Sequence, residues 1–248
     1  SAAHNNVRRQ AHEFGCGLES VLRERSDFTG ILNGIDVDIW NPATDKHIAA
    51  TYSAETLDRK LENKQALCKR MGLSYSATVP LFGIISRIVG QKGFDLLVSA
   101  LPEILNLPAQ LVLLGSGDPQ YEHILREIAR VFPDRAAVKI GYDEQLSHWI
   151  EAGADMFLMP SHYEPCGLNQ MMSMRYGTVP VVRATGGLAD TVVDADKDPM
   201  QGTGFSFEPY TTPALVSAAR RAVQAYKDQR RWRQIQQNGM SRDFSWNH

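Results

Sequence analysis

The chain contains few cysteines, and their spacing does not suit a disulfide framework or a zinc site. The three cysteines, Cys16, Cys68 and Cys166, lie far apart and form no Cys-x-x-Cys pair. This usage fits a reducing compartment, and no metal site is predicted. No apolar run approaches the roughly 20 residues of a membrane-spanning helix, so we expect no membrane partner. The N-terminus has no signal-peptide pattern and no initiator Met.

The chain also lacks a strong excess of charge of either sign. Its formal net charge is −2 over 248 residues, so the whole-chain charge does not predict a nucleic-acid partner. The apolar content of 43% and charged content of 22% are ordinary for a globular protein. The length allows one large domain or two small ones. A ligand that carries phosphates would therefore have to be bound by a local cluster of cations.

Short β-type runs alternate with helical patterns from about residue 80 onward. The expected strands are 81–86, 110–115, 136–140, 156–160, 179–183 and 204–207. The expected helices are 93–106, 119–131, 144–152, 168–176 and 214–226. Several of the strand runs are continuously apolar, which is typical of strands buried on both faces of a parallel sheet. The alternation predicts an α/β fold, a doubly wound parallel sheet with right-handed crossovers.

The N-terminal part of the chain has a different pattern. An amphipathic stretch at 53–71 ends at Gly72, as a helix does, and a short helix is expected at 15–25. Between them, an apolar run is interrupted by Asn-Gly and closed by Asn41-Pro42, which favours a connection between domains. A boundary near residues 30–40 leaves too little chain ahead of it for a second domain. The first residues are then either an arm or the tail of an absent domain.

Two cations follow the first expected strand. In an open parallel sheet, ligands bind beyond the carboxyl ends of the strands. Arg87 and Lys92 flank a flexible glycine there, and a helix begins directly after Gly93. The guanidinium fork and the ammonium point charge together suit a diphosphate. A solvated surface loop explains the same spacing, and at this point both interpretations remain open.

The next two strand ends carry weaker patterns. Gly115-Ser-Gly117 begins like a dinucleotide fingerprint, but the third glycine is absent, which counts against a nicotinamide enzyme. We interpret it as a turn and helix cap that lines a pocket. Tyr142 follows the third strand and could stack on a nucleobase, although packing is the more common role of a tyrosine at such a position.

The last two strand ends carry an acid and a pair of glycines. Glu164 begins a Glu-Pro-Cys-Gly turn, where it could bind sugar hydroxyls or stabilise a cationic transition state; capping of the next helix is the alternative. Cys166 is interpreted as a packing residue or a non-catalytic thiol, because no histidine can be placed beside it. Thr185, Gly186 and Gly187 would let backbone amides approach a phosphate or sugar, or simply form a strand-to-helix turn. Together, these successive strand ends predict a phosphate-bearing ligand.

Four motifs, in this order, resemble those of bacterial glycogen synthases and plant starch synthases. They are Gly30-Ile-Leu-Asn-Gly-Ile-Asp36 with Trp40-Asn-Pro42, Ser86-Arg-Ile-Val-Gly-Gln-Lys-Gly93, Glu164-Pro-Cys-Gly-Leu168 and Thr185-Gly-Gly-Leu-Ala-Asp-Thr-Val192. The resemblance covers essentially the whole chain, and the last two motifs are highly specific. These enzymes are retaining glycosyltransferases of the two-domain GT-B architecture, so the resemblance implies a Rossmann-like C-terminal domain of that architecture.

The resemblance implies transfer of glucose from ADP-glucose to the non-reducing end of an α-1,4-glucan. It implies no cofactor, since ADP-glucose and ADP are substrate and product. Glu164, Arg87 and Lys92 would be the catalytic residues. Retention without a placed nucleophile suggests that the two cations assist departure of ADP, while Glu164 orients or stabilises the sugar.

The resemblance also implies the residues that bind the donor. Arg87 and Lys92 would hold the diphosphate, Tyr142 would stack on adenine, and Glu164 would face the glucosyl group. The remaining donor-binding residues come from the two glycine-containing turns: Cys166, Gly167 and Leu168, whose turn would cap the phosphates, and Thr185, Gly186 and Gly187, which would line the sugar and phosphate pocket.

The sequence departs from the family in one large respect. Family members carry an N-terminal domain with a Lys-x-Gly-Gly loop and a histidine that contribute to the site, and neither is found here. We therefore expect residues 1–30 to be the tail of that missing domain, 31–44 an interdomain linker, and 45–248 the nucleotide-sugar-binding domain with its C-terminal helix truncated. Such a fragment would bind ADP without catalysing transfer.

Three questions remain open from the sequence. A non-catalytic nucleotide- or glucan-binding module of the same fold is the alternative function, since fold alone does not determine activity. A related enzyme that uses UDP-sugars is a further possibility, because Tyr142 does not specify the base. The expected location is the cytoplasm of a bacterium or the stroma of a plastid.

Overall fold

The fold is built on one six-stranded parallel sheet. A computed structural model describes residues 33–246, so the predicted tail 1–30 and the helix predicted at 15–25 lie outside the described residues. The strands are β1 (Leu81–Ile88), β2 (Gln110–Gly117), β3 (Ala136–Ile140), β4 (Met156–Met159), β5 (Val179–Arg183) and β6 (Phe205–Phe207). Their spatial order is β3-β2-β1-β4-β5-β6. All strands are parallel, and successive strands are added on one side of β1 up to β3 and on the other side from β4 onward, so the strand order reverses between β1 and β4.

Helices precede, connect and follow the strands along the chain. They are α3 (Lys60–Met71), α4 (Phe94–Asn106), α5 (Pro119–Val131), α6 (Glu144–Gly153), α7 (Asn169–Arg175), α8 (Gly186–Thr191), α9 (Thr212–Tyr226) and α10 (Gln229–Met240). Short 3-10 helices, η1 (Leu57–Arg59) and η2 (Gly90–Lys92), precede α3 and α4. The predicted doubly wound α/β fold is confirmed, as are the six strands.

Two predicted strand ends are wrong by two residues. β1 and β2 stay paired through Arg87↔Ser116 and Ile88↔Gly117, so both strands are longer than expected. Gly115-Ser-Gly117 is therefore the end of a strand and not a turn. The helix cap predicted beside it is confirmed in Asp118, whose Oδ1 accepts the Gln120 N–H at 2.8 Å.

The predicted helix 53–71 starts too early, and two helices, α8 and α10, were not predicted. Ser53 bonds locally, with its Oγ donating to Glu55 at 2.5 Å and its N–H donating to Thr56 Oγ1 at 2.9 Å. Such side-chain bonds compete with helix formation, and α3 begins only at Lys60. α10 was missed because its sequence is strongly polar and buries only Trp232, Ile235 and Gly239.

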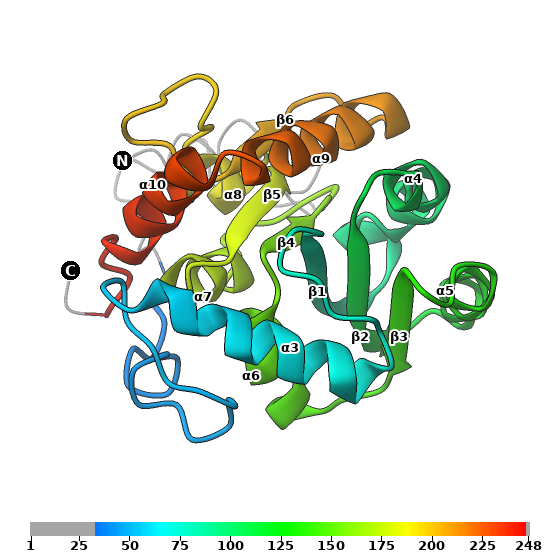
Figure 1. Cartoon of the computed structure of the whole chain (residues 1–248). Helices are drawn as coiled ribbons and strands as arrows, with labels where there is room; N and C mark the ends of the chain where they lie inside the picture. The colour runs from blue at the N-terminus through cyan, green and yellow to red at the C-terminus, as the bar shows by residue number, and fades with distance from the viewer. Residues whose placement is uncertain (1–32, 247–248) are drawn as a thin grey trace, which may run out of the picture.

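The helices cover both faces of the sheet (Figure 1). One core lies between the sheet and α4, α5, α9 and α10, and includes Phe82 and Leu97. The other lies against α3, α6, α7 and α8, and includes Leu67 and Phe157. Burial of each such side chain contributes about 1.5–3 kcal/mol. None of the helices within residues 33–246 combines the length and apolar character needed to cross a bilayer.

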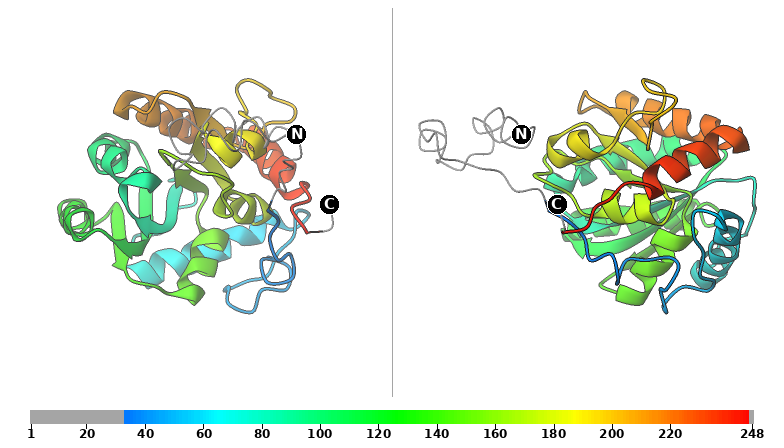
Figure 2. Two further views of the ribbon diagram at one scale, coloured as in Figure 1. Left: turned by 180° about the vertical axis from the view of Figure 1, so that it is seen from behind. Right: turned by 90° about the vertical axis from the view of Figure 1, so that its left-hand side faces the viewer.

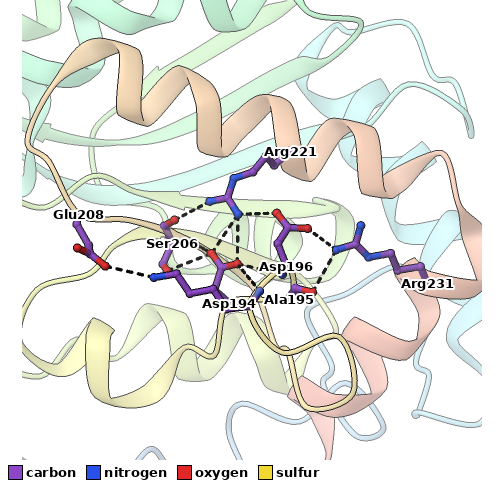
Figure 3. Close-up of polar contacts among 8 residues, drawn as sticks. Asp194, Ala195, Asp196, Ser206, Glu208, Arg221 and Arg231 are labelled. Carbon is purple, nitrogen blue, oxygen red and sulfur yellow. Dashed lines mark hydrogen bonds and ion pairs between the residues drawn. The ribbon is translucent and has the colours of Figure 1, made fainter.

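The loop between α8 and β6 is held by two arginines from the C-terminal helices (Figure 3). Arg221 Nη1 lies 3.2 Å from both oxygens of Asp194 and 2.6 Å from Asp196, and Arg231 lies 2.5 Å from Asp196. Burial alone would raise the pKa of the Asp194 carboxyl, but N–H donors from Ser206 and Asp196 and the charge of Arg221 lower it. The network ties α9 and α10 to the edge of the sheet.

The stretch ahead of α3, part of which was predicted as a linker, packs against α6 and α7 (Figure 2). Asp45 is its buried anchor, accepting bonds from the Nδ1 of His148 at 2.7 Å and from the hydroxyl of Tyr176 at 2.6 Å. Trp40 stacks on His148 with ring centroids 4.1 Å apart, and its carbonyl accepts a bond from Arg175 at 2.8 Å. Residues 33–52 are thereby joined to the helices that flank the sheet.

Next to this anchor, Glu151 is a buried acid whose stability effect depends on pH. It is 1% exposed, and burial raises its pKa to about 8 although a bond from Ser173 and the charge of Lys60 oppose this. Between the unfolded pKa of about 4.3 and the folded value, the native state holds the extra proton, so the unfolding free energy falls as pH rises. Burial also lowers the pKa of Lys60, to about 7.

We therefore expect Glu151→Gln to become more stable relative to the parent as pH increases. The difference in unfolding free energy should grow by about 1 kcal/mol per pH unit between pH 5 and 8. Urea denaturation at four pH values measures it, with Glu103→Gln on the exposed face of α4 as the control for loss of one carboxylate. A difference that stays constant over this range would show that Glu151 is ionised throughout.

Candidate functional site

A cavity of about 350 Å³ lies at the carboxyl ends of the central strands. Its walls come from the ends of β1, β2 and β4 and from the turns that lead into α6 and α7. This is the point where the strand order reverses, between β1 and β4. Open α/β sheets bind their ligands at such a point. The cavity is therefore the candidate active site.

The three predicted catalytic residues all line this cavity. Arg87 lies near the end of β1 and is exposed, and its guanidinium makes no hydrogen bond or ion pair with another residue of the described range. Lys92 ends the short η2 helix, and its Nζ lies 2.6 Å from Oε2 of Glu164. Ser161 Oγ also donates to that oxygen, at 3.4 Å. Of the two predicted anion-binding residues, Lys92 is therefore paired with the acid, whereas Arg87 has no ion-pair partner within the described residues.

Three predicted donor-binding residues contribute to the rim and the wall of the cavity. Tyr142 lines it and is 88% exposed, so its ring is free to contact a ligand and does not pack in the core. Gly167 and Leu168 line it at the start of α7. Gly167 has a φ of 75°, a left-handed conformation that suits glycine. The packing alternative for Tyr142 is thus wrong.

The other four predicted residues, Cys166, Thr185, Gly186 and Gly187, are not part of the cavity lining. The two glycines pack directly against the backbone of the turn that carries Glu164. A Cβ at Gly186 would lie 1.8 Å from the carbonyl oxygen of Glu164, and one at Gly187 would lie 2.0 Å from that of Cys166. The Gly187 N–H donates to the Glu164 carbonyl at 3.0 Å. Only glycine allows the two turns to pack this closely.

Several cavity residues were not predicted. Ser161 lies two residues after the end of β4 and donates to Glu164, and Asn169 begins α7 and donates from Nδ2 to the carbonyl of Ile85 at 2.8 Å. Ser147, on the first turns of α6, also faces the cavity. Ser161 could have been found, because it is the first polar residue after a buried strand. Asn169 and Ser147 have ordinary helical surroundings in the sequence.

The chemistry available in the cavity is electrostatic. Within residues 33–246, no three His, Cys, Asp or Glu side chains gather to hold a metal ion. Around one space lie the guanidinium of Arg87, which has no partner in the described part of the chain, the Lys92–Glu164 ion pair and the exposed ring of Tyr142. This combination suits an anionic ligand that also carries hydroxyls and an aromatic group.

Residues 74–239 match the sequence profile described as glycosyl transferases group 1. The chain belongs to the glycosyl transferases group 1 family. The match spans β1 to α10 and so contains the whole cavity.

This glycosyl transferase chain is similar to glycogen synthases over almost its whole length. It is 53% identical over 240 residues to the glycogen synthase of Cellvibrio japonicus, covering 96% of this chain and 50% of that protein. It is 54% identical over 233 residues to the glycogen synthase of an Anaeromyxobacter species, covering 94% of this chain and 49% of that protein. The chain thus spans about half the length of these relatives.

A solved structure supports the fold of this glycosyl transferase. The catalytic domain of starch synthase IV from Arabidopsis thaliana, bound to ADP and acarbose, superposes with a TM-score of 0.92 at 44% identity. The match covers 98% of this chain and 51% of that one. The GT-B assignment of the fold, inferred from the sequence motifs, agrees with this likeness.

Proposed function

We propose that this chain is the donor-binding half of a glucosyltransferase that moves glucose from ADP-glucose to the non-reducing end of an α-1,4-glucan, with retention. The observation that carries the proposal is the cavity between β1 and β4, where Arg87, the Lys92–Glu164 pair and Tyr142 meet. The similarity to glycogen synthases, and to a starch synthase bound to ADP and acarbose, supports this choice of donor and acceptor.

In the proposed reaction, the groups of the cavity meet successive parts of the donor. Tyr142 stacks on adenine at the rim, and Arg87 holds the diphosphate through its guanidinium fork. The charge that grows on departing ADP is offset by the two cations of the cavity, Arg87 and Lys92, and the sugar becomes oxocarbenium-like. Glu164 faces the glucosyl group and stabilises it electrostatically, and the turn at Gly167 and Leu168 lies against the phosphates.

The acceptor side of the site is proposed to belong to another domain. The similar glycogen synthases are about twice as long as this chain, which leaves room for an N-terminal domain that closes over the cavity. We propose residues 31–44 as the interdomain linker, with 45–248 as the nucleotide-sugar domain. The proposed setting is the bacterial cytoplasm or the plastid stroma.

Calorimetry of this chain with ADP, ADP-glucose and UDP tests the assignment. We expect binding of ADP and ADP-glucose in preference to UDP, and no incorporation of glucose into glucan. Failure to bind either adenine nucleotide would overturn the proposed donor, and glucan elongation by this chain would overturn the need for a second domain.

Arg87→Ala is expected to weaken ADP binding by about 10- to 100-fold, because it removes a charge-assisted contact to the diphosphate. Arg130→Ala is the matched control, since that arginine lies on the exposed side of α5 and pairs with Glu127. Calorimetric titration of both variants measures the effect. Equal ADP affinities in the two variants would contradict the role of Arg87.

A further inference from the structure

The cavity contains a buried acid paired with one of its two cations. Lys92 Nζ and Glu164 Oε2 are 2.6 Å apart, and their side chains are 23% and 6% exposed. The pair joins loops from two different strands, after β1 and after β4. These loops are tied by their backbones, since the carbonyl of Gln91 accepts the N–H of His162 at 3.0 Å. The contact is therefore fixed by two hydrogen-bonded turns and not by a mobile surface side chain.

The two cations of the cavity are consequently not equivalent. The Arg87 guanidinium has no counter-ion among residues 33–246, whereas the ammonium of Lys92 is already compensated. A diphosphate that enters the cavity has to compete with Glu164 for Lys92. It also approaches the negative charge of Glu164, which in a partly desolvated site repels it more strongly than in water. Arg87 alone is available without this cost.

We propose that the ion pair with Glu164 keeps Lys92 from binding the diphosphate, and that Lys92 leaves Glu164 only when a glucosyl group is bound. The proposal deepens the proposed function and rests on it, since the sugar is the group that engages Glu164. Sugar hydroxyls donate hydrogen bonds to the Glu164 carboxylate and replace the ammonium, which then turns to the diphosphate. Without the sugar, Lys92 stays on Glu164 and ADP is held mainly by Arg87. The ion pair thus favours the donor over the product ADP, and Lys92 is a positioning residue for Glu164 until the exchange.

Glu164→Gln separates this proposal from simple phosphate binding by both cations. The amide keeps the shape of the side chain but removes the charge, so Lys92 is free at all times. We expect ADP to bind about tenfold more tightly to this variant than to the parent chain, and the preference for ADP-glucose over ADP to shrink. In the double variant Glu164→Gln with Lys92→Met, the gain in ADP affinity should disappear.

The control variant makes the same change in net charge at a residue that does not line the cavity. Glu208→Gln removes one carboxylate from an exposed pair with Lys197, 3.2 Å apart, and should leave the affinity for ADP within twofold of the parent. A merely structural role of the Lys92–Glu164 pair would lower or preserve ADP affinity in Glu164→Gln. Urea denaturation of each variant confirms that the folded state is being compared.

Titration with inorganic pyrophosphate keeps the two proposals distinguishable. If the parent chain binds ADP but Glu164→Gln binds it no better, the exchange of partners is wrong and the proposed function stands. If the parent does not bind ADP, the proposed function is wrong, and a tenfold gain for pyrophosphate in Glu164→Gln would still support sequestration of Lys92. If Glu164→Gln gains affinity for neither ADP nor pyrophosphate, the inference is overturned.

Discussion

Asp155→Ala is expected to lower the free energy of unfolding by about 3–5 kcal/mol, because it leaves a buried ammonium without its counter-ion. Lys64 Nζ lies 2.7 Å from Asp155 Oδ2, and the two side chains are 1% and 8% exposed. The same carboxylate oxygen accepts the N–H of Leu81 at 2.8 Å. Asp155 therefore joins α3 to the starts of both central strands, β1 and β4.

Urea denaturation at neutral pH measures this loss, and two comparisons define its cause. Glu127→Ala breaks an exposed pair with Arg130 and should cost at most about 1 kcal/mol. Adding Lys64→Met to Asp155→Ala removes the unpaired charge and should recover at least about 1 kcal/mol. A double variant no more stable than Asp155→Ala would show that the lost bond to Leu81, and not the stranded charge, dominates.

Gly93→Ala is expected to cost about 3–4 kcal/mol of unfolding free energy, through backbone strain and overlap together. Gly93 has a φ of 79°, and an added Cβ would lie 2.0 Å from the carbonyl oxygen of Pro160. That oxygen belongs to the chain backbone directly after β4, so no side chain can rotate away to relieve the overlap. The loop that carries Lys92 would have to move away from the loop that carries Glu164.

Two other glycines separate the contributions to this cost. Gly72 has a φ of 74° with open space around its Cβ position, so Gly72→Ala should show the strain alone, about 1–2 kcal/mol. Gly90, in the same turn as Gly93, also has open space and no positive φ, so Gly90→Ala should change stability by less than about 1 kcal/mol. Equal costs at Gly72 and Gly93 would rule out the overlap with Pro160.

Much of the fold could be predicted because its signals are local. The apolar runs of the strands and the periodic helices 119–131 and 144–152 agree with the observed elements. The predictions fail where a tertiary contact or a local side-chain bond determines whether a helix forms or where it begins. α10 buries few apolar residues, and its start is marked only by Asp228, whose carboxylate accepts the N–H groups of Arg230 and Arg231 at 3.1 Å. α3 begins late because Ser53 bonds its own neighbours.

The buried side of α3 was beyond prediction for a different reason. Its inward face carries Lys60, Asn63 and Lys64, residues that a pattern of hydropathy assigns to solvent. Lys60 Nζ donates to the carbonyls of Glu151 and Ala152 at the end of α6, at 3.1 and 2.8 Å. These acceptors lie about ninety residues further along the chain, separations of 91 and 92. Only the folded arrangement makes such burial tolerable.

The sequence by itself determined the order of elements and the strand ends that meet at the cavity, because apolar periodicity and turn residues act over a few positions. It placed Arg87, Lys92 and Glu164 at one edge of a parallel sheet. The tertiary structure decided their relationship: Lys92 and Glu164 are separated by 72 residues and form an ion pair, while Arg87 has no such partner in residues 33–246. The tertiary structure also decided that Gly186 and Gly187 pack against the backbone at Glu164 and Cys166, because a close contact between two backbones depends on how segments distant in sequence are brought together.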